Sequence, residues 1–343
     1  MFTMSLQRKR FSSIPLKRKA LWPFVGIFLF ASCAPRPVSR HQETVLGFFN
    51  EVVLVGKEKT EREKLLAESF AILRDIEKKT SLSVKESEIF LLNQSGFPEA
   101  QNVSPEIFGL IKKSVRFHEE SSGAFDITVL PLIKLWGFHE GKPAVPEAPQ
   151  IEKTLPLVAS NLLFMDDGSK SIGFKIPGMG IDLHQIVRGY ACDRIITFLK
   201  SRSVPGALVN VGGTVRAYGQ SQDGKPWRVG LIHPRDPTRT FKVVTLVNEA
   251  VSTRGDYDRF FVVDGRRYSD IINPRTGYPP NSSVSVSVIA PSAMLSDVLA
   301  TALFILGPEK ASFLANRYKD IRWYLIYLSE GERFKTLYSE PAP

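Results

Sequence analysis

The sequence predicts an α+β fold in which antiparallel sheets pack against helices. Helical patterns cluster in the first part of the chain, and strand-like runs follow one another directly after about residue 205. The dipeptide Asp264-Gly265, which is typical of a tight type I′ hairpin turn, joins two of these runs. Adjacent strands joined by short turns form antiparallel sheets, whereas a doubly wound parallel fold alternates strands with helices throughout.

The composition is that of a folded globular protein with one or two domains. The 343 residues are 43% hydrophobic and 23% charged, which is too apolar for a disordered chain. Two cysteines exclude a disulfide framework, and five scattered histidines argue against a His-ligated metal centre. Six of the 45 basic residues precede residue 33, so the remainder carries 39 basic against 35 acidic residues, or +4. This balance does not require a nucleic-acid partner.

The first 32 residues are typical of a bacterial lipoprotein signal peptide. A basic run ending at Lys19 is followed by the thirteen uncharged residues 20–32, which are too few for a transmembrane helix of ~20 residues. The segment 30–33, Phe-Ala-Ser-Cys, resembles a lipobox, so we expect lipidation of Cys33 and a membrane-anchored lipoprotein exported to the bacterial periplasm. The alternative is a plain signal peptide. Residues 33–43 would form a Pro-containing polar tether, followed by one domain over 44–343.

The helices of the first part have recognisable starts. A short apolar strand around Leu54 precedes a helix from about residue 60 to residue 79, where Thr60 and Glu63 have the spacing of a capping box. Ser104 and Pro105 suit the N-cap and first turn of a second helix. A third helix is expected over roughly residues 185–202.

The second part is rich in short strands. Alternating or continuous apolar runs predict strands at residues 207–211, 227–232, 241–247, 260–263, 268–272 and 284–289. Gly307-Pro308 should end one helix and start the next, because proline is tolerated only in a first helical turn. Residues 323–328 and 334–338 should form a closing hairpin.

Two clusters contain carboxylates beside apolar runs. Asp126 is the single carboxylate within residues 122–138, so it either faces a site or caps backbone amides. Asp182 ends a strand just before a helix start, and Arg188 lies one turn into that helix. A helix N-terminus with a guanidinium is a plausible phosphate site; the alternative is that Arg188 pairs with Asp193 or another surface carboxylate.

Two further clusters point to close backbone approach and to a cation. Gly212-Gly213 follows a strand directly, but the sequence lacks the patterns of a nucleotide P-loop and of a Rossmann turn. Asp297 and Thr301 are four residues apart, so on a helix their oxygens project from one face and could hold Mg²⁺. The alternative is a threonine that bonds back to its own helix.

Taken together and in this order, the clusters resemble the bacterial FAD:protein FMN transferases, the ApbE family. The similarity runs from about residue 44 to the C-terminus, with its most specific motifs at residues 123–128, 182–193, 210–213, 252–257, 273–277 and 290–303. The resemblance implies a Mg²⁺-dependent reaction in which FAD is split at its pyrophosphate. The FMN half is esterified to a threonine or serine hydroxyl of an exported or membrane flavoprotein, and AMP leaves.

The resemblance also implies roles for individual residues. Asp297, Thr301 and the backbone oxygen of Gln185 would hold Mg²⁺. The FAD site would be lined by Leu46, Ser83, Ala124, Phe125, Asp126, Asp182, Arg188 and Ile272.

Several positions depart from the family pattern, and they cluster at the site. Arg188 stands where lysine is usual, Asp270 stands where histidine is usual, and Arg254 replaces a small residue. We take Asp270 and Arg188 as the candidate catalytic residues, although an aspartate with an ordinary pKa of ~4 is a weaker base than histidine. The alternatives are an FAD hydrolase that uses water as acceptor and a flavin-binding lipoprotein without catalysis.

Overall fold

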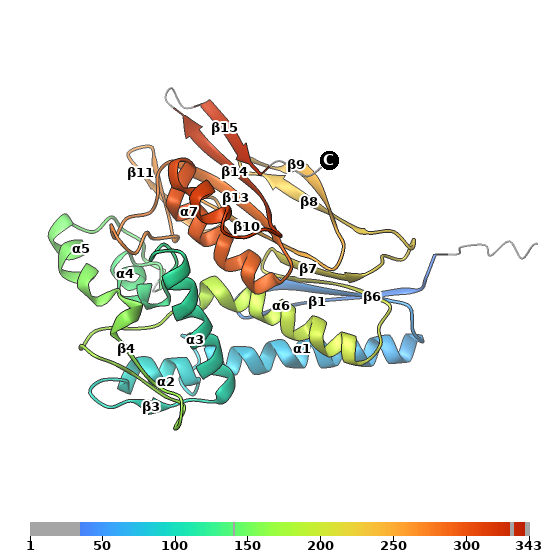
Figure 1. Ribbon diagram of the computed structural model, residues 1–343, viewed down its shortest axis with the longest axis horizontal. Coiled ribbons are helices and arrows are strands. Elements are labelled where there is room, and N and C mark those ends of the chain that lie inside the picture. Colours follow the sequence, from blue (N-terminus) through green and yellow to red (C-terminus); the bar gives the residue numbers. More distant parts are fainter. Residues whose placement is uncertain (1–34, 140, 330–332, 340–343) are drawn as a thin grey trace, which may run out of the picture. The chain divides into compact units, whose positions relative to one another are not determined.

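The computed structural model describes residues 35–139, 141–329 and 333–339. Its centre is an antiparallel sheet with the strand order β1-β2-β6-β7-β10-β13-β14-β15 (Figure 1). These strands are β1 (Val38–Val45), β2 (Phe48–Val55), β6 (Gly206–Val211), β7 (Thr214–Gly219), β10 (Ala250–Gly255), β13 (Ser283–Ala290), β14 (Arg322–Ser329) and β15 (Arg333–Tyr338). The predicted α+β class is confirmed.

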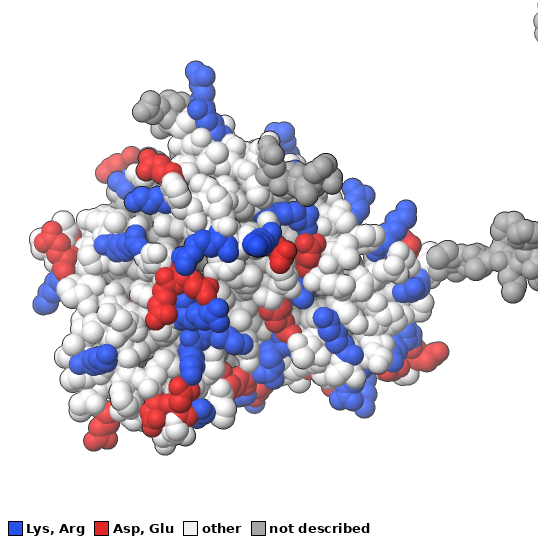
Figure 2. Space-filling view, in the orientation of Figure 1, with Lys and Arg blue, Asp and Glu red and all other residues white. Residues whose placement is uncertain are grey.

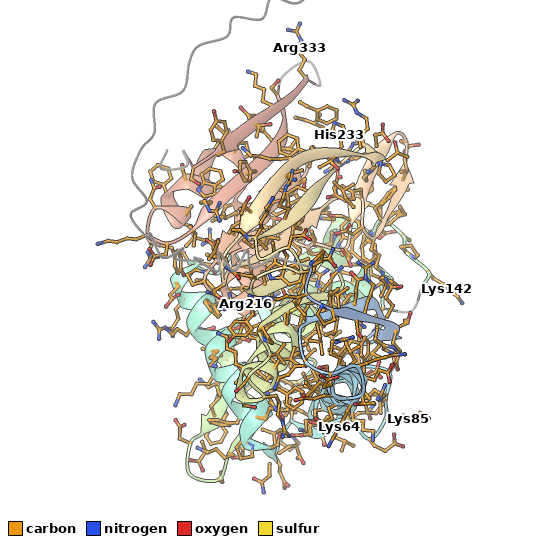
Figure 3. All side chains as sticks on the ribbon, turned by 90° about the vertical axis from the view of Figure 1, so that its right-hand side faces the viewer. Lys64, Lys85, Lys142, Arg216, His233 and Arg333 are labelled. Atoms are coloured by element: carbon orange, nitrogen blue, oxygen red, sulfur yellow. The ribbon has the colours of Figure 1, made fainter. Side chains whose placement is uncertain are left out.

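Helices cover one face of this sheet and a β-hairpin covers the other. The helical face holds α1 (Lys59–Thr80), α6 (His184–Ser201) and α7 (Ala293–Ala315), and the opposite face holds β8 (Trp227–His233) paired with β9 (Asp236–Leu246). Strand β2 shows why its run is apolar throughout, because Val52 and Leu54 face the helices while Val53 and Val55 face the hairpin. In Figure 3, His233 of the hairpin lies toward one end of the molecule and Lys64 of α1 toward the other.

Smaller elements form a second group beside the helical layer (Figure 1). They comprise α2 (Glu88–Ser95), α3 (Pro105–Glu120), the 3₁₀ turn η1 (Ile127–Val129), α4 (Leu130–Leu135), α5 (Ala148–Thr154), the 3₁₀ turns η2 (Leu155–Leu157) and η3 (Ser160–Leu162), and a small sheet of β3 (Gln101–Asn102), β5 (Ser171–Phe174) and β4 (Leu163–Asp166). The hairpin of β11 (Phe260–Val263) and β12 (Arg266–Ser269) packs Phe261 and Tyr268 against Trp136.

Helices α6 and α7 approach each other closely at Gly189. A Cβ atom at this position would lie 2.4 Å from the carbonyl oxygen of Ala293, at the start of α7. The first turn of α7 is capped from α6, because the Asp193 carboxylate accepts hydrogen bonds from the N–H groups of Ala293 and Met294. Helix α7 is long and apolar enough to cross a membrane by composition, but two-thirds of its apolar window is buried in the core. It therefore acts here as a core helix.

Most predicted elements are present, and their signals have the expected causes. Ser104 accepts a hydrogen bond from the Ile107 N–H at the start of α3. Asp264 and Gly265 both have positive φ, as a type I′ turn requires. Gly307, with φ 69°, interrupts α7 before Pro308. The closing hairpin is β14 paired with β15.

Other expectations were wrong. Helix α1 begins at Lys59 with Glu58 as N-cap and no side-chain cap bond, so the capping box at Thr60 does not form. The polar residues 38–43 belong to β1 and not to a tether, because β1 pairs along its whole length with the apolar strand β2. The predicted strand at residues 268–272 ends at Ser269, where the chain turns toward the cavity described below. The predicted signal peptide and Cys33 lie outside the described residues.

Acidic and basic side chains alternate over the face shown in Figure 2. No extended patch of one sign covers this view, in keeping with the small charge surplus of the chain after residue 33. Charged side chains also gather inside the protein, around one cavity.

Candidate active site

A cavity of about 1180 Å³ lies where several segments of the chain meet. Its walls are the β1–β2 turn at residues 46–49, the end of α1 with residues 81–84, residues 182–188 at the start of α6, and the β6–β7 turn. Residues from 254 to 271 close the remaining side. This volume exceeds that of many small-molecule sites, which run from ~300 to ~1000 Å³, so the cavity has room for an extended ligand.

The structure brings most of the predicted site residues together. The cavity is lined by Leu46, Ser83, Asp182, Gln185, Arg188 and Asp270. Leu46 has a positive φ of 60° in the β1–β2 turn, and its N–H donates to the Glu77 side chain of α1. Asp297 and Thr301 are fully buried, but Arg188 Nε lies 4.0 Å from Asp297 Oδ1, so the predicted cation site and the predicted phosphate site are neighbours.

Four predicted cofactor-binding residues are not among the lining residues. Phe125 and Ile272 are core residues, and Ala124 lines a second, smaller cavity. Asp126 caps the turn η1: it accepts hydrogen bonds from the N–H and hydroxyl groups of Thr128 and Ser160. Although burial opposes it, His118 and these hydrogen bonds lower the pKa of Asp126. The capping interpretation of Asp126 is therefore the correct one, since the apolar run around it folds into helical turns that need an acceptor.

Arg188 is held rigidly beside the β6–β7 turn. Its Nη1 donates to the Gly212 carbonyl at 2.9 Å, and its guanidinium lies 5.2 Å from the centre of the Phe48 ring. Gly212 has a positive φ of 55°, and a Cβ there would lie 2.7 Å from Phe48 and 2.9 Å from Arg188. The paired glycines are thus needed for close backbone approach, and the alternative pairing of Arg188 with Asp193 does not occur, because Asp193 caps α7.

Three carboxylates and two guanidinium groups share one side of the cavity: Asp182, Asp258, Asp270, Arg188 and Arg259. Burial raises the pKa of Asp182 and of Asp258. Burial also raises the pKa of Asp270 to about 7, with Asp258 and Asp182 acting in the same direction and the two arginines opposing them. These surroundings move the pKa of Asp270 from its ordinary value of ~4 into the range suited to a general base.

His184 does not provide a competing base. Burial, together with the charges of Arg188 and Arg259, lowers its pKa to about 3. Its ring lies against Phe48, with ring centres 4.7 Å apart, and the backbone N–H of His184 donates to Asp182 Oδ1. His184 is therefore neutral near pH 7.

The predicted magnesium ligands are already engaged by an arginine. Arg254 of β10 lines the cavity and donates from Nη2 to Asp297 Oδ1 at 2.8 Å and from Nε to Thr301 Oγ1 at 3.0 Å. Asp297 Oδ1 also accepts from Ser252 and Thr214, and Oδ2 accepts from the Gly189 N–H. Arg254 thus separates the oxygen pair from the cavity.

A divalent cation does not fit this donor set. Both oxygens point at a guanidinium, and at ~4 Å a unit positive charge opposes a divalent one by roughly 8 kcal/mol at an effective dielectric of ~20. Within the described ranges, no group of three or more His, Cys, Asp or Glu side chains is arranged to hold a metal ion. Gln185 lines the cavity on the first turn of α6.

Sequence reasoning missed Arg254 as a structural partner, as well as Asp258 and Arg259. Ser252 and Arg254 are two residues apart on β10, so both face α7 and both reach Asp297. This alternation could be read from the sequence, but the packing of α7 against β10 could not. Asp258 and Arg259 enter the cavity from the connection between β10 and β11, which carries no periodic signal.

Comparisons with known proteins agree with this architecture. The ApbE family model matches residues 46–325. A FAD:protein FMN transferase of Klebsiella pneumoniae is 33% identical over 297 residues, covering 85% of this chain and 84% of the relative. One of Escherichia coli strain K12 is 30% identical over 336 residues, covering 94% and 95%.

Solved structures agree as well. The ApbE protein of Thermotoga maritima aligns with a TM-score of 0.80 at 31% identity, covering 87% of this chain and 96% of that one. The flavin transferase ApbE of Vibrio cholerae aligns with a TM-score of 0.80 at 28% identity, covering 89% and 98%. On the family match and on relatives of this identity and coverage, the chain belongs to the ApbE family.

Proposed function

We propose that this protein transfers the FMN half of FAD to a threonine or serine hydroxyl of an exported or membrane flavoprotein, releasing AMP. One observation carries the proposal: a single cavity combines the guanidinium groups of Arg188 and Arg259 with Asp270, whose pKa is about 7. A diphosphate needs positive charge along its bridge, and a hydroxyl nucleophile needs a proton acceptor. The names of the relatives, FAD:protein FMN transferase, support the same reaction.

The residues would divide the work as follows. Arg188 and Arg259 bind the diphosphate oxygens and offset the charge that builds up on them. The acceptor hydroxyl oxygen forms a bond to the phosphorus of the FMN half, its proton passes to Asp270, and the bond from this phosphorus to the bridging oxygen breaks. AMP leaves with that oxygen. Because Arg188 is fixed by Gly212 and Phe48, its guanidinium is positioned before the substrate binds.

We assign no step to a bound metal, although the sequence predicted Mg²⁺. That ion would require Asp297 and Thr301, and both are bonded to Arg254. The metal question is therefore part of the test of function.

One incubation tests the proposal. The full-length chain, purified in detergent, is combined with FAD and a flavoprotein acceptor that carries a modifiable threonine, with Mg²⁺ in one series and a chelator in the other. Covalent fluorescence on the acceptor together with AMP supports transfer. AMP without labelling indicates an FAD hydrolase instead, and bound flavin without either product indicates a binding protein.

Two aspartate variants sharpen the result. Asp270→Asn should reduce labelling by roughly 10² to 10⁴ and remove the acidic limb of the pH profile near pH 7. Asp258→Asn removes a neighbouring carboxylate from the same cavity wall and should retain that limb. Equal losses in the two variants would contradict a specific role for Asp270 as base.

We also propose that the protein is an exported lipoprotein, anchored by Cys33 and facing the periplasm. The segment 30–33 and the uncharged stretch before it support this. Cys33→Ser should move the protein from the membrane fraction to the soluble fraction, because one residue carries the lipid. Retention of the variant in the membrane fraction would contradict lipidation at Cys33.

A further inference from the structure

The feature that the proposed reaction does not use is the buried ion pair of Arg254 with Asp297. Both side chains are almost fully buried, and Arg254 reaches two acceptors at once, Asp297 Oδ1 and Thr301 Oγ1. These are the oxygens that the sequence pattern offered to a divalent cation. Arg254 donates to Thr301 Oγ1 from Nε and to Asp297 Oδ1 from Nη2, so the guanidinium forms a fork with the two oxygens.

The surroundings of the fork satisfy the carboxylate completely. Asp297 Oδ1 accepts from Arg254 and from the hydroxyl groups of Ser252 and Thr214, whose oxygens lie 2.9 Å apart. Asp297 Oδ2 accepts from the Gly189 N–H on α6. The four donors come from three elements, β10, β7 and α6, with β10 contributing two. A metal ion would have to displace several of these bonds, and the buried guanidinium would then lose its partner.

Arg254 also belongs to the cavity wall. It lines the cavity with Arg188 and Arg259, and Arg188 Nε lies 4.0 Å from the same Asp297 oxygen. This Nε is buried without a hydrogen-bond partner among the described residues. Arg188, Arg254 and Arg259 therefore place three guanidinium groups in the cavity wall, and Asp297 Oδ1 lies close to two of them, Arg254 and Arg188.

We propose that Arg254 is a built-in cation: its guanidinium occupies the Asp297–Thr301 oxygen pair in place of a divalent metal, so this pair is not a metal site in this chain. The part concerning metal exclusion stands on the geometry alone. The second part rests on the proposed function: Arg254 contributes fixed positive charge beside the substrate diphosphate. In that role it is a positioning residue for the ligand oxygens and for Arg188.

Direct metal binding tests the first part. The full-length chain in detergent is titrated with Mn²⁺, and free Mn²⁺ is followed by electron paramagnetic resonance. Wild type should bind Mn²⁺ at this site no more tightly than millimolar. Arg254→Ser, which frees both oxygens, should bind at least tenfold more tightly, and adding Asp297→Asn should reverse the gain. Arg259→Ser is the matched control, because it removes a cavity guanidinium and leaves the fork intact; it should behave as wild type.

If Arg254→Ser does not fold, Mn²⁺ binding by wild type and by Asp297→Asn tests the proposal. Micromolar Mn²⁺ binding by wild type that is lost in Asp297→Asn would overturn the proposal, because Arg254 would then yield to the metal. Arg254→Lys gives a second measure: a single ammonium cannot span both oxygens, so Mn²⁺ affinity should rise above that of wild type. Unchanged affinity in folded Arg254→Ser and Arg254→Lys would also overturn it.

The second part has a separate readout. Wild type should bind FAD equally well in a chelator and in Mg²⁺, measured by quenching of flavin fluorescence, whereas Arg254→Ser should bind FAD at least tenfold more weakly in the chelator and recover affinity in Mg²⁺. If no variant binds FAD, the proposed function fails while the Mn²⁺ result stands. If wild type needs Mg²⁺ to bind FAD, the assignment of Arg254 is wrong.

Discussion

Replacing Asp270 by asparagine tests the electrostatics of the cavity through folding stability, independently of any reaction. The variant keeps the shape of the side chain and removes its charge. In the folded protein the pKa of Asp270 is about 7, mainly because of burial, against ~3.9 in an unfolded chain. The folded state therefore binds this proton more tightly. Its contribution to stability is fully present below pH ~4 and is lost as the pH rises through about 7.

The size of the effect follows from the shift. A displacement from ~3.9 to about 7 corresponds to ~4 kcal/mol of unfolding free energy across that pH range. Because Asp270 lines a cavity that water enters, we reduce this figure to ~2 kcal/mol. Because part of this change already occurs between pH ~3.9 and pH 5, Asp270→Asn should gain ~1.3 kcal/mol of stability relative to wild type between pH 5 and pH 8.5.

Denaturant titrations of both proteins at these two pH values, at equal ionic strength, measure the difference. Asp223→Asn, an exposed aspartate between β7 and β8, is the control and should show no such gain. A stability difference between Asp270→Asn and wild type that is the same at both pH values would refute the raised pKa, and with it the proposed base.

Two further substitutions test how the site is held. Gly189→Ala should cost ~2–4 kcal/mol in thermal or denaturant unfolding, because the new methyl group would lie 2.4 Å from the Ala293 carbonyl; Gly109→Ala in α3, where the added atom meets nothing within 4 Å, should be neutral or slightly stabilising. Asp126→Ala should cost ~3 kcal/mol near pH 7 by removing the acceptor for Thr128 and Ser160. Because the pKa of Asp126 is lowered, wild type should lose this advantage as the pH falls below ~4, whereas a cost that is constant with pH would contradict the capping role.

Helix ends and tight turns could be predicted where a few adjacent residues determine the backbone conformation. The N-cap at Ser104, the turn at Asp264-Gly265 and the break at Gly307 depend on the backbone preferences of a few adjacent residues. Strands β7 and β10 were missed, since they are six residues long and carry the polar side chains Arg216 and Arg254 in the interior. Those residues are accommodated by partners distant in sequence, and no window of local sequence contains them.

The candidate site shows the same division. The glycine pair at 212–213 and the helix start before Arg188 were recognisable because each reflects local geometry. The apolar run around Asp126 suggested a site, but the Asp126 carboxylate caps the turn η1. The pKa of Asp270 depends on burial and on Asp258, Asp182 and two arginines brought in by folding, so its strength as a base was not visible in the sequence.

The pairing of β10 with β13 has a consequence for how the chain avoids misfolding. Arg254 lies opposite Val286, and Ser252 lies opposite Val288. A shift of β10 by one residue would turn Arg254 to the hairpin side of the sheet and leave the Asp297 carboxylate in the protein interior without its countercharge. The unpaired buried carboxylate alone would destabilise the misaligned sheet by several kilocalories per mole. Arg254, which lies in the cavity wall, thus also favours the correct alignment of the strands that build it.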